Sequence, residues 1–151
     1  MKILMVCLGN ICRSPIADGI MRKLISDHRL DWEIDSAGTG SWHVGEAPDA
    51  RAQKTALGFG VDISPLRARL FTSRDFDAFD KIYVMDSSNY RDVIAQARND
   101  EDRHKVEILL NLVEPGRNKA VPDPWYDEKL FVPVFRMIEE ACQEIIRRHK
   151  A

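Results

Sequence analysis

Short apolar runs alternate with longer amphipathic segments along most of this chain. The apolar runs have the length of β-strands and cover residues 3–6, 32–34, 81–85 and 106–110. The longer segments repeat their apolar residues every three or four positions, as helices with one buried face do. The first of these segments begins near Ser14, and the other three cover residues 50–57, 88–97 and 131–145. Strands that alternate with helices are joined by right-handed crossovers and run parallel, so the pattern predicts a three-layer α/β fold with a central parallel sheet.

Composition excludes several other classes of protein. The chain has 151 residues, with 22 Lys and Arg against 24 Asp and Glu, which gives a formal net charge of −2. Nucleic-acid-binding domains usually carry a basic excess, so we expect no nucleic-acid partner. A single domain over residues 1–151 is the simplest organisation for this length. No run approaches the ~20 apolar residues of a membrane-spanning helix, and neither end resembles a targeting signal.

The chain contains three cysteines: Cys7, Cys12 and Cys142. An odd number without a secretory signal argues against a disulfide framework and favours a cytoplasmic protein with a free reactive thiol. Cys142 falls on the apolar stripe of the last predicted helix, so we expect it in the core.

The segment between the first predicted strand and the first predicted helix has the features of an anion-binding loop. It consists of Cys7, Leu8, Gly9, Asn10, Ile11, Cys12, Arg13 and Ser14, followed by Pro15. A glycine-containing loop that enters a helix directs backbone N–H groups and the positive end of the helix dipole at an anion. Arg13 can bind two phosphate oxygens at once, and this environment would favour a thiolate at Cys7. We therefore expect residues 8–14 to bind phosphate, Cys7 to be the nucleophile, and Ser14 to donate a hydrogen bond to its sulfur. In the alternative interpretation, Cys7 is a small buried residue and Arg13 a surface charge.

Expulsion of an alkoxide or phenolate from a phosphate ester requires a general acid. The candidate is Asp123, which lies between Pro122 and Pro124 in a segment where the prolines restrict the direction of its carboxyl group. An ordinary Asp-Pro turn is the alternative. Nearby aromatic residues favour the catalytic interpretation, because they could wall a slot for a flat ring; they are Trp42, Trp125 and Tyr126.

With these residues in place, the chain resembles the low-molecular-weight protein tyrosine phosphatases over essentially its whole length. Residues 7–15 resemble the phosphate-binding loop of that family, and Asp123 with Pro124 resembles its acid-bearing loop. Residues 35–39, 76–80 and 85–89 resemble its second- and third-strand segments. The resemblance implies a four-stranded parallel sheet, catalytic roles for Cys7, Arg13 and Asp123, and no metal or organic cofactor. It also implies that Trp42, Trp125 and Tyr126 wall the pocket.

The resemblance further implies that Asn10 and Ser36 belong to a hydrogen-bond network that holds the loop. The family commonly has a histidine and a glutamine in this region, where the present chain has Leu66 and Leu70. Because an apolar side chain cannot replace the hydrogen bond of a histidine, water or another residue would have to substitute. A redox role for Cys12, through a reversible disulfide with Cys7, is a further hypothesis, and a packing role is its alternative.

The expected reaction is hydrolysis of phosphotyrosine in a protein substrate through a phosphocysteine on Cys7, with inorganic phosphate as product. The expected protein is a monomer or a weak homodimer. An arsenate reductase of the same fold is one alternative, although it would relay electrons through two further cysteines. A non-catalytic phosphopeptide-binding module is the other, although it would need neither Cys7 nor Asp123.

Overall fold

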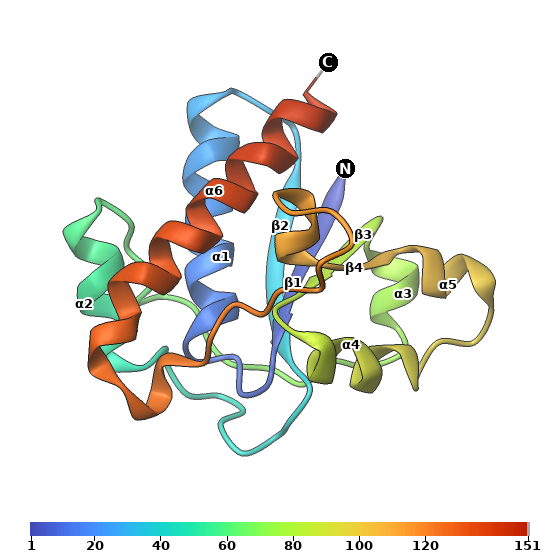
Figure 1. Ribbon diagram of the computed structural model, residues 1–151, viewed down its shortest axis with the longest axis horizontal. Coiled ribbons are helices and arrows are strands. Elements are labelled where there is room, and N and C mark those ends of the chain that lie inside the picture. Colours follow the sequence, from blue (N-terminus) through green and yellow to red (C-terminus); the bar gives the residue numbers. More distant parts are fainter. Residues whose placement is uncertain (151) are drawn as a thin grey trace.

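The computed structural model describes residues 1–150, which form a sheet of four parallel strands (Figure 1). The strands are β1 (Lys2–Cys7), β2 (Glu33–Gly38), β3 (Lys81–Val84) and β4 (Val106–Ile108), and their order across the sheet is β2-β1-β3-β4. The expected four-stranded parallel sheet is therefore confirmed.

Helices cover both faces of this sheet. Figure 1 shows α1 (Arg13–Asp27), α2 (Ala50–Gly58) and α6 (Phe131–His149) on one side. On the other side lie α3 (Asp75–Ala78), α4 (Ser87–Ile94) and α5 (Asp100–His104). Short 3₁₀ helices complete the fold at Leu109–Leu112, Pro124–Tyr126 and Glu128–Leu130. The arrangement is the expected three-layer α/β sandwich.

Strand β1 separates two hydrophobic clusters, because successive side chains of a strand point to opposite faces. Ile3 and Met5 pack in the cluster that includes α1, α2 and α6. Leu4 and Val6 pack in the cluster on the other face, together with Phe76 and residues of β3 and β4. A central strand buried on both faces requires a continuous apolar run, which is what β1 has.

Helix α6 packs against the core through the apolar residues whose spacing predicts a helix. Its buried residues include Val134, Ile138, Cys142 and Ile145, which form one stripe against the core. Cys142 is fully buried, which confirms its expected place in the core.

Strand β2 is the clearest departure from the predicted elements. The apolar pattern predicts a strand over residues 32–34, whereas the strand covers Glu33–Gly38. Its two central residues, Asp35 and Ser36, are polar, so apolar periodicity does not mark them, and only the family resemblance over residues 35–39 indicates a strand there.

Other elements also differ from the prediction. Helix α4 ends at Ile94 rather than at Ala97, and β4 ends at Ile108 because the chain turns into a 3₁₀ helix. The segment 98–105 contains α5, which was not predicted and in which buried Asp102 pairs with Arg98. In addition, α3 was not predicted.

Among the described residues, no helix is both long and apolar enough to cross a membrane. The connection from β1 to α1 lies at the carboxyl end of the sheet, where open parallel sheets bind their ligands.

Candidate active site

A cavity of about 210 Å³ opens at the carboxyl end of β1. Its lining brings together the loop before α1, the segment after β2 and the segment around Asp123. The lining residues are Cys7, Leu8, Gly9, Ile11, Cys12, Arg13, Trp42, His43, Asp123, Trp125 and Tyr126. No side chain caps the N-terminus of α1, so its first N–H groups remain available to a bound anion.

Cys7 ends β1 at the base of this cavity and is only 3% exposed. The backbone N–H of Asn10 donates to its sulfur at 3.3 Å, and the Ser14 hydroxyl lies 3.1 Å from the same atom. Both groups lie where they could donate a hydrogen bond to a thiolate.

Asn10 holds the loop from behind the cavity. Its backbone is in the left-handed region, with φ of 56°, which asparagine tolerates better than most residues. Its side-chain Nδ2 donates to Ser14 Oγ at 2.7 Å and to Ser36 Oγ at 3.0 Å. Asn10 and Ser14 are buried, and neither lines the cavity. Their side chains point away from the cavity and support the backbone of the loop.

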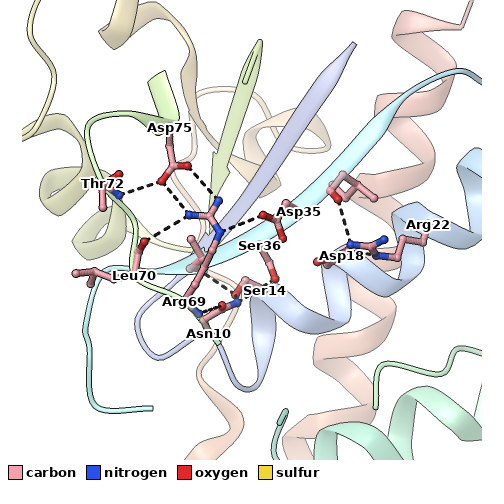
Figure 2. Close-up of polar contacts among 12 residues, drawn as sticks. Asn10, Ser14, Asp18, Arg22, Asp35, Ser36, Arg69, Leu70, Thr72 and Asp75 are labelled. Atoms are coloured by element: carbon pink, nitrogen blue, oxygen red, sulfur yellow. Dashed lines mark hydrogen bonds and ion pairs between the residues drawn. The ribbon is translucent and has the colours of Figure 1, made fainter. Parts of the chain in front are cut away.

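The remaining acceptor of Asn10 is its Oδ1, and it is satisfied by the backbone N–H of Arg69 at 3.0 Å. Figure 2 shows this contact beside Leu70, one of the two leucines in place of polar residues. Leu70 is 40% exposed, and Leu66 packs on the edge of the core. A backbone group, rather than a side chain at either leucine, therefore completes the network.

Arg13 lines the same cavity as Cys7 and is nearly buried, with its side chain 4% exposed. Its Nη1 donates to Asp86 Oδ2 at 2.7 Å and to the Val121 carbonyl at 3.0 Å. Burial opposes its positive charge, but Cys7 and Asp86 outweigh burial and raise the pKa of Arg13. The guanidinium is thus charged and held in a fixed orientation at the cavity wall.

Asp123 faces Arg13 across the cavity, with 3.9 Å between its Oδ2 and Arg13 Nη2. Its other carboxyl oxygen accepts a hydrogen bond from the Trp125 N–H at 3.1 Å and caps the 3₁₀ helix that begins at Pro124. Arg51 fixes the same segment by donating to the Trp125 carbonyl at 3.1 Å, and its guanidinium lies 5.3 Å from the centre of the Trp125 ring.

Three aromatic side chains lie at the rim of the cavity. Trp42 is 70% exposed, Tyr126 is 92% exposed, and Trp125 is half-buried. Because Cys7 is buried while these rings reach solvent, its thiol is recessed below an aromatic mouth. Gly40 makes room for Trp42, since a Cβ at that position would overlap the indole ring.

Cys12 also lines the cavity. Burial raises the pKa of its thiol, and the nearby Asp49 and Cys7 raise it further. Cys12 is thus held as a neutral thiol at physiological pH, and its redox role stays a prediction.

Several site residues were missed by the sequence reasoning. Asp86, which orients Arg13, follows β3 at the carboxyl end of the sheet, and this position is a signal that could have revealed it. Arg51 lies in the first turn of α2, His43 and Arg69 lie in the connections on either side of that helix, and no local motif marks them. Within residues 1–150, no group of His, Cys, Asp and Glu side chains is arranged to hold a metal ion.

Comparison with known families agrees with this geometry. Residues 2–151 match the family model described as low molecular weight phosphotyrosine protein phosphatase. The chain belongs to this family. The match includes every element that contributes to the cavity.

Individual proteins are similar to this chain along nearly its whole length. The low molecular weight phosphotyrosine protein phosphatase of Gallus gallus is 38% identical in an alignment of 151 positions, which covers 97% of this chain and 94% of the relative. The crystal structure of a protein tyrosine phosphatase from Entamoeba histolytica is 37% identical, with a TM-score of 0.91 over 98% of this chain and 96% of that one. A Drosophila arginine phosphatase, DARP, is 31% identical, with a TM-score of 0.92 over 100% of this chain and 99% of that one.

Proposed function

We propose that this protein is a phosphatase that hydrolyses phosphotyrosine in protein substrates through a phosphocysteine on Cys7. The observation that carries the proposal is one cavity with a buried thiol at its base, a charged arginine and a carboxyl group on its walls, and aromatic rings at its mouth. Membership of the family supports phosphatase activity.

In the first step, the Cys7 thiolate attacks phosphorus and forms an S–P bond. The bond from phosphorus to the tyrosine oxygen breaks, and this oxygen takes a proton from the Asp123 carboxyl group. Arg13 and the N–H groups at the start of α1 stabilise the charge on the three remaining phosphate oxygens.

In the second step, Asp123 is ionised and takes a proton from a water molecule as the water oxygen attacks phosphorus. The S–P bond breaks, inorganic phosphate forms, and the electron pair returns to the Cys7 sulfur. The Ser14 hydroxyl, 3.1 Å from that sulfur, stabilises the departing thiolate by donating a hydrogen bond.

Two alternatives fit the molecule less well. An arsenate reductase would need two further thiols near the nucleophile, but Cys12 alone lines the cavity beside Cys7, while Cys142 is buried within α6 and lies outside the cavity lining. A phosphopeptide-binding module would have no use for the carboxyl group of Asp123 opposite the thiol. The recessed position of Cys7 favours a long, flat phosphotyrosine side chain over the shorter phosphoserine.

The test is hydrolysis of matched peptides that carry phosphotyrosine, phosphoserine or phosphoarginine, measured as the rate of phosphate release. The wild type is expected to hydrolyse phosphotyrosine fastest, and Cys7→Ser is expected to lose this activity. Cys142→Ser is the control, because it changes a thiol outside the cavity and should remain active.

Faster hydrolysis of phosphoarginine than of phosphotyrosine would contradict the proposed substrate class. Binding of phosphotyrosine without phosphate release would support a binding module instead. Thiol oxidation driven by arsenate would favour the reductase.

A further inference from the structure

Arg69 connects two carboxylates that belong to different elements of the fold. Its Nε donates to Asp35 Oδ2 of β2 at 3.0 Å. Its Nη1 and Nη2 donate to the two carboxyl oxygens of Asp75, at the start of α3, at 3.2 Å and 3.1 Å. Figure 2 shows the guanidinium between these two side chains. Asp75 is nearly buried and also accepts from the Thr72 N–H, so its orientation is fixed.

The backbone of the same residue reaches the nucleophile through two side chains. The Arg69 N–H donates to Asn10 Oδ1, Asn10 Nδ2 donates to Ser14 Oγ, and Ser14 Oγ lies beside Cys7 Sγ. A second route is shorter, since the Asn10 N–H donates directly to the same sulfur. The position of the Arg69 backbone therefore bears on both hydrogen-bond donors of Cys7.

The segment that carries Arg69 lies between α2 and α3, outside any helix or named strand. Backbone hydrogen bonds attach it to Gly38, which donates to the Arg69 carbonyl at 2.8 Å and accepts from Phe71 at 2.7 Å. These bonds set its distance from β2. The ion pairs of Arg69 fix it at a second point, and the neighbouring Leu70 supplies no polar side chain to help.

We propose that Arg69 is a positioning residue for the nucleophile. Its guanidinium, held between Asp35 and Asp75, keeps its own backbone N–H against Asn10 and so maintains the left-handed turn that directs two donors at Cys7. The inference rests on the proposed function of Cys7 and adds a residue that does not touch the cavity.

Arg69→Met tests this role, because methionine retains an unbranched apolar chain but loses every ion pair. Arg98→Met is a matched control, since Arg98 also bridges two carboxylates, those of Asp77 and Asp102, outside the cavity. Two quantities are measured well below the melting temperature of each variant: kcat for an aryl phosphate, and the pH dependence of Cys7 alkylation by iodoacetate.

For Arg69→Met we expect kcat to fall roughly 10- to 100-fold, because small displacements of catalytic groups have effects of this size. We expect the alkylation profile to move to higher pH, because the thiolate loses well-placed donors. Arg98→Met should lower the melting temperature while leaving both quantities at wild-type values. Arg69→Lys, which can reach one carboxylate at a time, should fall between wild type and Arg69→Met.

A wild-type kcat and alkylation profile in Arg69→Met would overturn the inference. So would equal changes in Arg98→Met, because they would indicate a general loss of stability. If Arg69→Met does not fold, Arg69→Lys and Asp35→Asn decide by the same two measurements. Failure of the proposed function is distinguishable, because wild-type protein would then release no phosphate while its alkylation profile still reports on Arg69.

Discussion

Individual side chains near Cys7 fall into two groups, those that line the cavity and those that hold the loop from behind. Cys7, Arg13 and Asp123 line it, and their types and spacing allowed their prediction from the sequence. Asn10 hydrogen-bonds Ser36, as family resemblance implies. The support from Arg69 was not predictable, because a backbone N–H leaves no trace in the residue type and its ion-pair partners are distant in sequence.

Asp123 gives a prediction at this scale. Replacement of Asp123 by Asn removes the proton that the leaving group needs, so we expect a loss of roughly 10²- to 10⁴-fold in kcat/KM for phenyl phosphate. The loss should be much smaller for an ester whose leaving group is a weak base, such as a dinitrophenol. The measurement is kcat/KM across a series of substituted phenyl phosphates.

Asp127→Asn is the matched control. Asp127 lies in the same segment and also caps a 3₁₀ helix, by accepting from the Lys129 N–H at 3.0 Å, but it is outside the cavity lining. It should retain wild-type dependence on the leaving group. An equal loss for all leaving groups in Asp123→Asn would rule out Asp123 as the acid.

At the scale of elements, the polar residues of β2 show where apolar periodicity fails to predict a strand. β1 and α6 were predictable because their apolar residues follow the periods of a buried strand and an amphipathic helix. In β2, Ser36 and Asp35 face hydrogen-bond and ion-pair partners, and the last residue, Gly38, lies against the loop between β1 and α1. These polar residues therefore stand at positions of β2 where an apolar pattern would otherwise mark a strand.

Gly38 makes the packing of β2 against the loop testable. A Cβ at this position would lie 2.8 Å from the Leu8 carbonyl oxygen and 3.1 Å from the backbone nitrogen of Asn10. Gly38→Ala should therefore displace the loop, lower the free energy of unfolding by about 1–3 kcal/mol and reduce kcat. Chemical denaturation and steady-state hydrolysis measure the two effects.

Gly58→Ala provides the comparison, because a Cβ at Gly58, the last residue of α2, meets no atom within 4 Å. It should leave kcat unchanged and stabilise the fold by about 0.4–1 kcal/mol, since alanine restricts the unfolded chain. Full activity in Gly38→Ala would show that the loop does not depend on this contact.

For the whole molecule, the sheet explains how residues from distant parts of the chain meet at one cavity. Parallel strands end at the same edge, so the loop after β1, the segment after β2 and Asp86 after β3 converge there. The architecture followed from the alternation of strands and helices, but the pairing of Arg13 with Asp86 required the sheet order. The net charge of −2 gives no hint of this buried arginine, because it sums all charged residues of the chain regardless of their position.

The central claim is that Cys7 becomes phosphorylated during turnover, and the most direct measurement is acid quenching followed by mapping of the phosphoryl group by mass spectrometry. Wild type and Asp123→Asn would be mixed with para-nitrophenyl phosphate and quenched within the first turnover, with Cys12→Ser as a control for the neighbouring thiol. We predict a phosphoryl group on the sulfur of Cys7 in all three proteins, and none in Cys7→Ser. Turnover with no phosphoryl group on Cys7, or with one on another residue that persists in Cys7→Ser, would contradict the account.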